Sequence, residues 1–212
     1  MPTVIFKLWG IFKRLSLIDR WGLMYCTTRE NTKEHSWDVA SIAFNLVVIS
    51  NSFFSGKLDP SKAATYGVFH DAPEAITGDM PTPLKYFSAE VKAASDQVEA
   101  LAIRKIVSCV PAEMQGAFSD VLNIPTEYKV IVKAADRIAG LAKCLEERKR
   151  GNDEFARAET RIRQLLSETS KEMPEVRFFL EHFLPGFQLS LDDICEGNGS
   201  WIIDGEEEGG VA

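Results

Sequence analysis

The sequence lacks any hydrophobic run long enough to cross a membrane. No stretch of about 18 consecutive apolar residues occurs in the chain, and the apolar segment 4–9 is interrupted by Lys7 and soon followed by Lys13 and Arg14. A signal peptide needs an unbroken apolar region and a small-residue cleavage site, and neither is present here. We therefore expect no membrane partner and no signal peptide, and we predict a surface helix with one apolar stripe at the N-terminus.

Cysteines are few, and basic residues form no block. Four cysteines are scattered along the chain without C-x-x-C spacing, which is typical of reduced, buried thiols in a cytoplasmic protein rather than of disulfide bonds. The net charge is −7. We therefore expect no nucleic-acid polymer as a partner. A small anionic ligand is still compatible with this charge, because local charge at a site can oppose the global sign.

Strand patterns, internal repeats and linkers are also missing, and the dominant period is helical. With 212 residues, 45% of them hydrophobic, the chain can form one domain with a substantial core. We predict a single all-α domain over residues 1–196 and a loose, acidic, glycine-rich tail over 197–212. The predicted helices span residues 32–50, 61–70, 88–109, 111–122, 126–150, 152–169 and 174–184, with a final turn after Ser190.

Some segments within this pattern are unusual. Pro73 cannot donate a helical hydrogen bond, so the second helix should kink or restart near Asp71. Small residues at 63, 64 and 67 would let another helix approach closely. The segment 78–83 contains a glycine and two prolines and predicts an irregular loop, of the kind that often carries binding groups. The first half of the helix 126–150 is apolar almost all round, which indicates a central, buried helix.

Histidine and aspartate stand in three of these apolar helical segments. His35 lies on the buried stripe of its helix, the adjacent pair His70 and Asp71 follows an apolar stretch, and Asp136 is set within the central helix. Burying such groups unpaired costs several kcal/mol, so some partner must compensate them. Two imidazoles and two carboxylates are a full set of ligands for one divalent metal. These donors suit Mn, Co, Fe, Ni or Zn better than Ca.

Each of these residues also has an ordinary structural explanation. His35 alone could be a hydrogen-bonded core histidine, and Asp136 could pair with Lys133 or Arg137. Only their joint occurrence favours a metal site. His182 has no suitable acidic neighbour, so we leave it out of the predicted site.

Glu74 lies one helical turn beyond His70 on the same face. Four protein ligands leave open positions on the metal, where a water molecule becomes a usable nucleophile. A carboxylate beside that water could act as a general acid or base. The alternative for Glu74 is a solvated side chain paired with Lys85 or another cation.

These motifs resemble those of the HD-domain phosphohydrolases, and more narrowly those of the bacterial HD-domain 5′-deoxynucleotidases. The H…HD…D pattern alone is moderately specific, whereas the run HDAPEAITGDMPTPLKYF together with Arg20-Trp21 is highly specific. The resemblance covers roughly residues 10–195, through the stretches 15–21, 29–36, 70–87, 133–136, 143–147 and 183–192. The chain departs from the family pattern at Gly22, where a stiffer residue is often found, and at 25–28.

The resemblance implies a helical bundle around one divalent metal (Co, Mn, Zn or Mg) held by His35, His70, Asp71 and Asp136. It implies that the chain hydrolyses deoxyribonucleoside 5′-monophosphates and forms homodimers. Glu74 matches the family's catalytic acid or base.

The resemblance also assigns residues to the substrate. Arg20 matches a phosphate-contacting residue, Trp21 a bulky residue that crowds the sugar 2′ position, and Asp79 an acceptor for the sugar 3′-hydroxyl. An Arg is a natural fork for phosphate oxygens, and a rigid indole is a good steric wall. The predicted substrate-binding set is completed by His35, His70, Thr82, Pro83, Leu84, Lys85 and Asp136.

Two other functions have to be weighed. Related HD proteins hydrolyse deoxynucleoside triphosphates to nucleoside and triphosphate, and Lys85, Arg29 and Lys33 could supply the positive charge that a longer phosphate chain needs. A nucleotide-sensing protein with a retained metal pocket would have lost a ligand or Glu74, and none is lost. We therefore predict a hydrolase acting on monophosphates, with the triphosphate reaction as the alternative.

Overall fold

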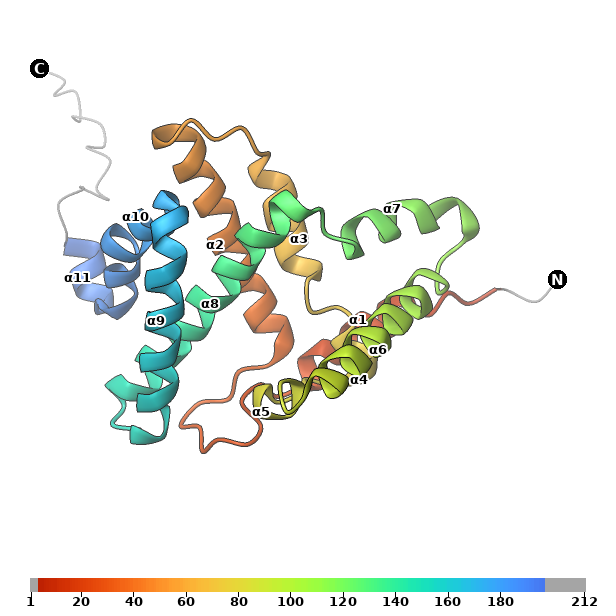
Figure 1. Ribbon diagram of the computed structural model, residues 1–212, viewed down its shortest axis with the longest axis horizontal. Helices are drawn as coiled ribbons and strands as arrows, with labels where there is room; N and C mark the ends of the chain where they lie inside the picture. The colour runs from red at the N-terminus through yellow and green to blue at the C-terminus, as the bar shows by residue number, and fades with distance from the viewer. Residues whose placement is uncertain (1–3, 197–212) are drawn as a thin grey trace, which may run out of the picture.

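The computed structural model describes residues 4–196, and helices dominate this part of the chain (Figure 1). The all-α prediction is confirmed. The predicted tail 197–212 lies outside the described residues. The elements in chain order are α1 (Leu8–Lys13), η1 (Arg14–Leu17), α2 (Thr32–Phe53), α3 (Pro60–Phe69), α4 (Glu74–Thr77), α5 (Thr82–Lys85), α6 (Ala89–Val107), α7 (Ala112–Leu122), α8 (Thr126–Lys149), η2 (Asp153–Phe155), α9 (Ala156–Glu172), α10 (Pro174–His182), η3 (Leu184–Gln188) and α11 (Leu191–Glu196).

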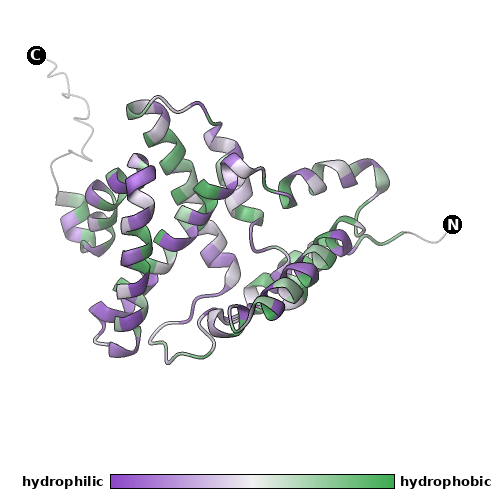
Figure 2. Cartoon of the chain, in the orientation of Figure 1, coloured by the Kyte–Doolittle hydropathy of each residue, from purple (hydrophilic) through white to green (hydrophobic). Residues whose placement is uncertain are grey.

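The main core forms where α2, α3, α8, α9 and α10 pack together. Helix α8 is central to it, because most of its residues from Tyr128 to Glu147 are buried. This confirms the prediction of a buried helix there. Val39, Leu46 and Ile138 are among the fully buried side chains of the core, and Figure 2 shows hydrophobic residues along α2 and α8. The core therefore fixes the relative positions of the two helices that carry His35 and Asp136.

A second group of helices lies to one side of this bundle (Figure 1). Helix α6 contacts α4, α5 and α7, and α1 contacts α4. A small cluster around Ala72, Ile106 and Leu122 holds the group together. Helix α1 has no buried residue, which fits the predicted surface helix. No helix in the described range has both the length and the apolar composition needed to cross a bilayer.

Helices α2 and α3 pack with almost no space between their backbones. A Cβ atom added at Gly67 would lie 2.5 Å from the Cα atom of Ala40, and Ala63 is fully buried. The prediction of a close helix approach is therefore confirmed. This contact sets the end of α3, where His70 follows, directly against α2.

The chain after α3 confirms one local prediction and corrects another. Helix α3, which was predicted to kink or restart near Asp71, ends at Phe69. Residues 70–73 form a turn, and α4 starts at Glu74 directly after Pro73. The predicted irregular loop is correct only for 78–81, because Thr82 and Pro83 open the short helix α5. A proline in the first turn of a helix loses no hydrogen bond, so it can start a helix as well as end one.

Candidate active site

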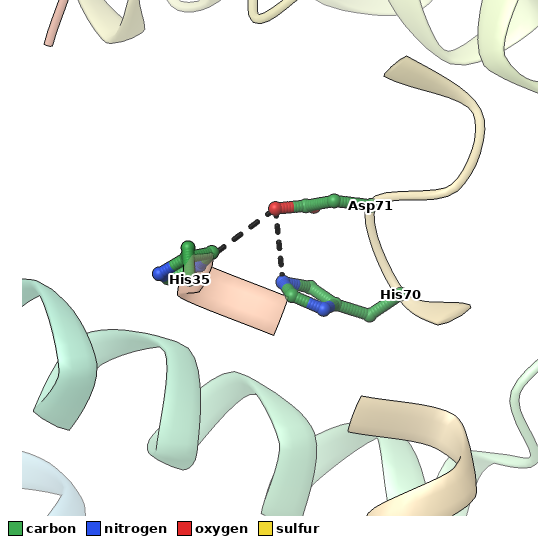
Figure 3. A group of neighbouring side chains, drawn as sticks. All are labelled: His35, His70 and Asp71. Carbon is green, nitrogen blue, oxygen red and sulfur yellow. Dashed lines mark ion pairs between the residues drawn. The ribbon is translucent and has the colours of Figure 1, made fainter. Parts of the chain in front are cut away.

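The predicted metal ligands come from three separate elements and meet in the structure. His35 lies in the first turn of α2, His70 and Asp71 in the turn after α3, and Asp136 in the middle of α8. The Nε2 atom of His70 is 3.0 Å from Oδ2 of Asp71, and Nε2 of His35 is 3.7 Å from the same oxygen (Figure 3). The turn that Pro73 forces after α3 lets both His70 and Asp71 face this point.

Asp136 adjoins the group from α8. Its Oδ1 atom is 3.3 Å from Nε2 of His35, and its Oδ2 atom is 2.6 Å from Nζ of Lys133. The ordinary ion pair with Lys133 therefore does form, but it uses only one carboxylate oxygen. Among the described residues, His35, His70 and Asp71 each offer a ligand atom within 4.8 Å of the others, and Asp136 borders this trio through His35.

Both histidines point ring nitrogens into the site that accept or donate no hydrogen bond within the described part of the chain. Nδ1 of His70 lies 2.8 Å from the carbonyl oxygen of Gly67, which leaves Nε2 for the site. Nε2 of His70 and both ring nitrogens of His35 are buried, and none of them has a hydrogen-bond partner within residues 4–196. Unsatisfied buried polar atoms are costly, and a cation bound by nitrogen and oxygen would satisfy them. The residues present thus fit a divalent metal.

The charges in the site favour a positive group between the carboxylates. Burial disfavours a protonated His70, but the nearby negative charge of Asp71 outweighs burial and raises the pKa of His70 to about 9. Burial would raise the pKa of Asp71, but His70 and Arg20 lower it to about 2. The pKa of Asp136 is well below its usual value against the effect of burial, because of His35 and Lys133. Both carboxylates are therefore ionised at neutral pH.

Glu74 is the first residue of α4 and faces the same region. Its Oε2 atom accepts a hydrogen bond from Oγ1 of Thr32 at 3.2 Å. Burial, followed by the negative charges of Asp71 and Asp79, raises the pKa of Glu74 to about 8. Lys85 instead lies 4.0 Å from Glu99. A buried carboxyl group with such a pKa can give or take a proton near neutral pH.

Arg20 contacts one of the predicted metal ligands, and Trp21 follows it in the chain. The Nη1 atom of Arg20 donates to Oδ2 of Asp71 at 3.3 Å, and its Nε atom is 3.5 Å from Oε2 of Glu30. The indole of Trp21 packs against the tilted ring of Phe155, with ring centroids 5.3 Å apart, and its Nε1–H donates to Glu30 at 3.0 Å. Glu30 lies in the stretch 29–36, but its place in this site was not predicted from the sequence.

The remaining predicted substrate residues follow α4. Asp79 lies in the segment between α4 and α5, where burial raises its pKa and the charge of Arg20 opposes that rise. Thr82, Pro83 and Leu84 are exposed on α5. Lys85 is half-buried beside α6. Their contact with a nucleotide stays a prediction.

Comparison with known families gives a match over most of the chain. A family model described as 5′-deoxynucleotidase YfbR-like matches residues 7–187. A 5′-deoxynucleotidase of Shewanella oneidensis is 44% identical over 186 residues, covering 85% of this chain and 93% of that relative. The Escherichia coli protein 5′-deoxynucleotidase YfbR is 40% identical over 186 residues, covering 86% of this chain and 92% of that relative.

Solved structures share the fold at lower identity. An HD-domain phosphohydrolase of Listeria innocua superposes with a TM-score of 0.75 at 23% identity, covering 85% of this chain and 88% of that one. The HD phosphohydrolase DatZ of cyanophage S-2L, solved with dA and one catalytic Zn²⁺ ion, superposes with a TM-score of 0.59 at 20% identity, covering 84% of this chain and 96% of that one. The helical bundle is therefore the HD-domain phosphohydrolase fold.

Proposed function

The chain belongs to the YfbR-like 5′-deoxynucleotidase family, and on this premise we propose that it hydrolyses deoxyribonucleoside 5′-monophosphates to deoxynucleoside and phosphate. The observation that carries the proposal is the meeting of His35, His70, Asp71 and Asp136 with Arg20 beside them. Unpartnered buried imidazole nitrogens next to ionised carboxylates make a cation site, and a guanidinium at its edge makes it a phosphate site.

The four metal residues hold one divalent cation in this proposal. A bound cation would polarise the phosphoryl group and supply an acidic water for the attack on phosphorus. The ion in this proposal is Co, Mn, Zn or Mg. The relative solved with Zn²⁺ supports a transition metal.

Arg20 and Glu74 act directly on the substrate. Arg20 is almost fully buried, and burial opposes its charge, but Asp71, Asp136 and Glu30 keep its pKa raised, so it stays a cation. It binds the phosphate oxygens and stabilises the charge that develops on them. Glu74, whose pKa is about 8, delivers a proton to the 5′-oxygen of the leaving nucleoside or accepts one from the attacking water.

Trp21 and Asp79 set the choice of sugar. The rigid indole blocks the space that a 2′-hydroxyl group would need, so ribonucleotides are rejected by a clash. Asp79 accepts a hydrogen bond from the 3′-hydroxyl group. Thr82, Pro83, Leu84 and Lys85 line the nucleotide beyond it.

The triphosphate alternative receives less support. Of the three basic residues considered for a longer phosphate chain, Arg29 is paired with Asp19 at 3.1 Å and Lys85 lies beside Glu99. Lys33 is exposed. The relatives at about 40% identity carry the name 5′-deoxynucleotidase, which favours the monophosphate reaction.

Phosphate release tests this function. Metal-loaded protein is incubated with each deoxyribonucleoside and ribonucleoside monophosphate and with dATP, and phosphate and triphosphate are measured separately. We expect phosphate from deoxyribonucleotides, much less from ribonucleotides and no triphosphate from dATP. Glu74→Gln should lower kcat by about 10²–10⁴-fold. Glu113→Gln is a matched control, since Glu113 also lies in a first helical turn but is exposed on α7. Absence of phosphate from every deoxyribonucleotide contradicts the proposal.

Assembly and location complete the proposal. We expect a homodimer, as the family resemblance implies, and a cytoplasmic location, as the scattered cysteines without C-x-x-C spacing indicate. Light scattering coupled to gel filtration measures the mass of the particle, and a monomeric mass at micromolar concentration contradicts the dimer.

A further inference from the structure

Glu30 contacts several residues of the active site, although the proposed reaction gives it no role. Its Oε2 atom accepts the indole Nε1–H of Trp21 at 3.0 Å and lies 3.5 Å from Nε of Arg20. Its Oε1 atom lies 3.9 Å from Nδ1 of the metal ligand His35. The Glu30 side chain is only 11% exposed. One nearly buried carboxylate thus lies close to Arg20, the proposed phosphate-binding residue, to Trp21, the proposed sugar-selecting residue, and to His35, a proposed metal ligand.

The backbone fixes Glu30 relative to these groups. The Arg20 amide donates to the Glu30 carbonyl at 2.9 Å, and the Thr32 amide donates to the Ile18 carbonyl at 3.0 Å. An isolated antiparallel bridge joins Asp19 to Asn31 between these bonds. We call these two short segments, 18–20 and 30–32, the clasp. The clasp leads directly into α2, so Glu30 and His35 are placed by the same structure.

Trp21 depends on its contacts more than an ordinary surface tryptophan does. Its φ angle is +59°, a left-handed backbone conformation that is unfavourable for a bulky side chain. Such a residue keeps one orientation only if its surroundings hold it. Here the ring packs on the fully buried Phe155 and its N–H is bound by Glu30.

From this geometry we infer that Glu30 is a positioning residue that determines sugar selectivity. Its carboxylate holds the indole of Trp21 where it meets the 2′ position and keeps the guanidinium of Arg20 turned toward the phosphate. Glu30 itself touches neither the substrate nor the metal. The inference rests on the proposed function, because it takes Trp21 as the wall against a 2′-hydroxyl group.

Kinetics with paired substrates measures this role. Glu30→Leu keeps most of the bulk but removes the acceptor. The ratio of kcat/KM for a deoxyribonucleotide over its ribonucleotide should therefore fall by about 10- to 100-fold, the range that one hydrogen bond to a charged group is worth. Glu30→Gln keeps a carbonyl acceptor for the indole N–H, so the ratio should stay within about threefold of the wild type. Asp19→Asn is the matched control, since Asp19 is in the clasp but pairs with Arg29 at the surface.

Hydrogen exchange of the indole N–H tests the contact without any activity. In ¹⁵N spectra of the wild type, the Trp21 indole should exchange more slowly than those of Trp9 and Trp37, which are 77% and 72% exposed. Glu30→Leu should abolish this protection, and Asp19→Asn should keep it. The wild-type measurement stands even if the leucine variant does not fold.

The outcomes separate the two claims. If the Trp21 indole exchanges as fast as that of Trp37, or if its protection survives Glu30→Leu, the contact is wrong. If protection is lost but the selectivity ratio does not change, Glu30 holds the indole without determining selectivity, and the inference is overturned. If the wild type hydrolyses no deoxyribonucleotide, the proposed function fails first and the role of Glu30 in it fails with it, while the exchange data still report the contact.

Discussion

A buried ion pair on α8 anchors the loop that follows Arg20 and Trp21. Glu147 has no exposed side-chain surface and Lys143 has 3%. Lys143 Nζ donates to Glu147 at 2.6 Å and to the carbonyl and hydroxyl oxygens of Thr28 at 2.7 and 2.9 Å, so all three of its hydrogens are used. Glu147 also accepts from the amide and hydroxyl of Thr27 at 2.8 and 2.7 Å and from Asn152 at 2.8 Å. The loop between Trp21 and Glu30 is thereby tied to α8.

Removing one partner leaves the other charge buried. Such a change costs about 3–5 kcal/mol of unfolding free energy. The cost of Glu147→Leu should lie at the upper end of this range, because Lys143, Thr27 and Asn152 all lose the acceptor of a hydrogen bond. Lys143→Met should cost less, because Glu147 keeps its bonds from Thr27 and Asn152. The double variant should cost clearly less than the sum of the two, since no buried charge remains.

Urea unfolding at neutral pH measures these free energies. The matched control is Lys92→Met, which breaks a pair of the same i,i+4 spacing with Asp96 on the exposed face of α6 and should cost less than about 1 kcal/mol. Despite burial, the bonds from Lys143, Asn152 and Thr27 hold the pKa of Glu147 well below its usual value. The stabilisation is therefore present above the unfolded-state pKa of Glu147, about 4.3, and is lost as the pH falls below it. If Glu147→Leu lowers the unfolding free energy by less than about 1 kcal/mol, the buried pair does not anchor the loop as described.

Two further predictions concern helix packing and metal binding. Gly67→Ala should destabilise the protein by about 1–3 kcal/mol in thermal unfolding, because its Cβ meets backbone atoms of Ala40 that cannot yield, whereas Gly116→Ala on α7 meets nothing within 4 Å and should be neutral or stabilising. Equal effects of the two would contradict the packing. The pKa of His70 is raised to about 9 in the metal-free protein, compared with about 6.5 in the unfolded chain. Protonation of His70 therefore stabilises the fold fully below about pH 6.5, and this stabilisation is lost as the pH rises through about 9. A metal must displace that proton, so metal affinity measured against a chelator should rise by up to about tenfold per pH unit as the pH increases toward about 9, and a flat profile would contradict this.

The sequence was sufficient to predict most helices and the four residues that meet at the candidate metal site. Apolar residues at helical spacing reveal a buried face wherever it is long, as in α2 and α8, and a polar group on such a face stands out, as His35 and Asp136 do. Pro73 indicated the restart that lets His70 and Asp71 face one point. These features are local, so they can be read from neighbouring residues.

Other parts of the site depend on contacts between distant segments. Glu30 looks like an ordinary surface glutamate in the sequence, and only the clasp between 18–20 and 30–32 brings its carboxylate to Trp21 and Arg20. The Lys143–Glu147 pair resembles an exposed salt bridge until the loop 25–28 covers it. The short helix α5 was missed because a proline pair signals a loop and a helix start equally well.

Titration of the metal-free protein with Co²⁺ tests the central claim most directly. We expect one ion bound per chain and a visible absorption spectrum of a site with nitrogen and oxygen ligands. Binding should be at least tenfold weaker in both His35→Ala and Asp136→Ala. Unchanged binding in these variants, or no binding of any divalent transition ion by the wild type, would contradict it.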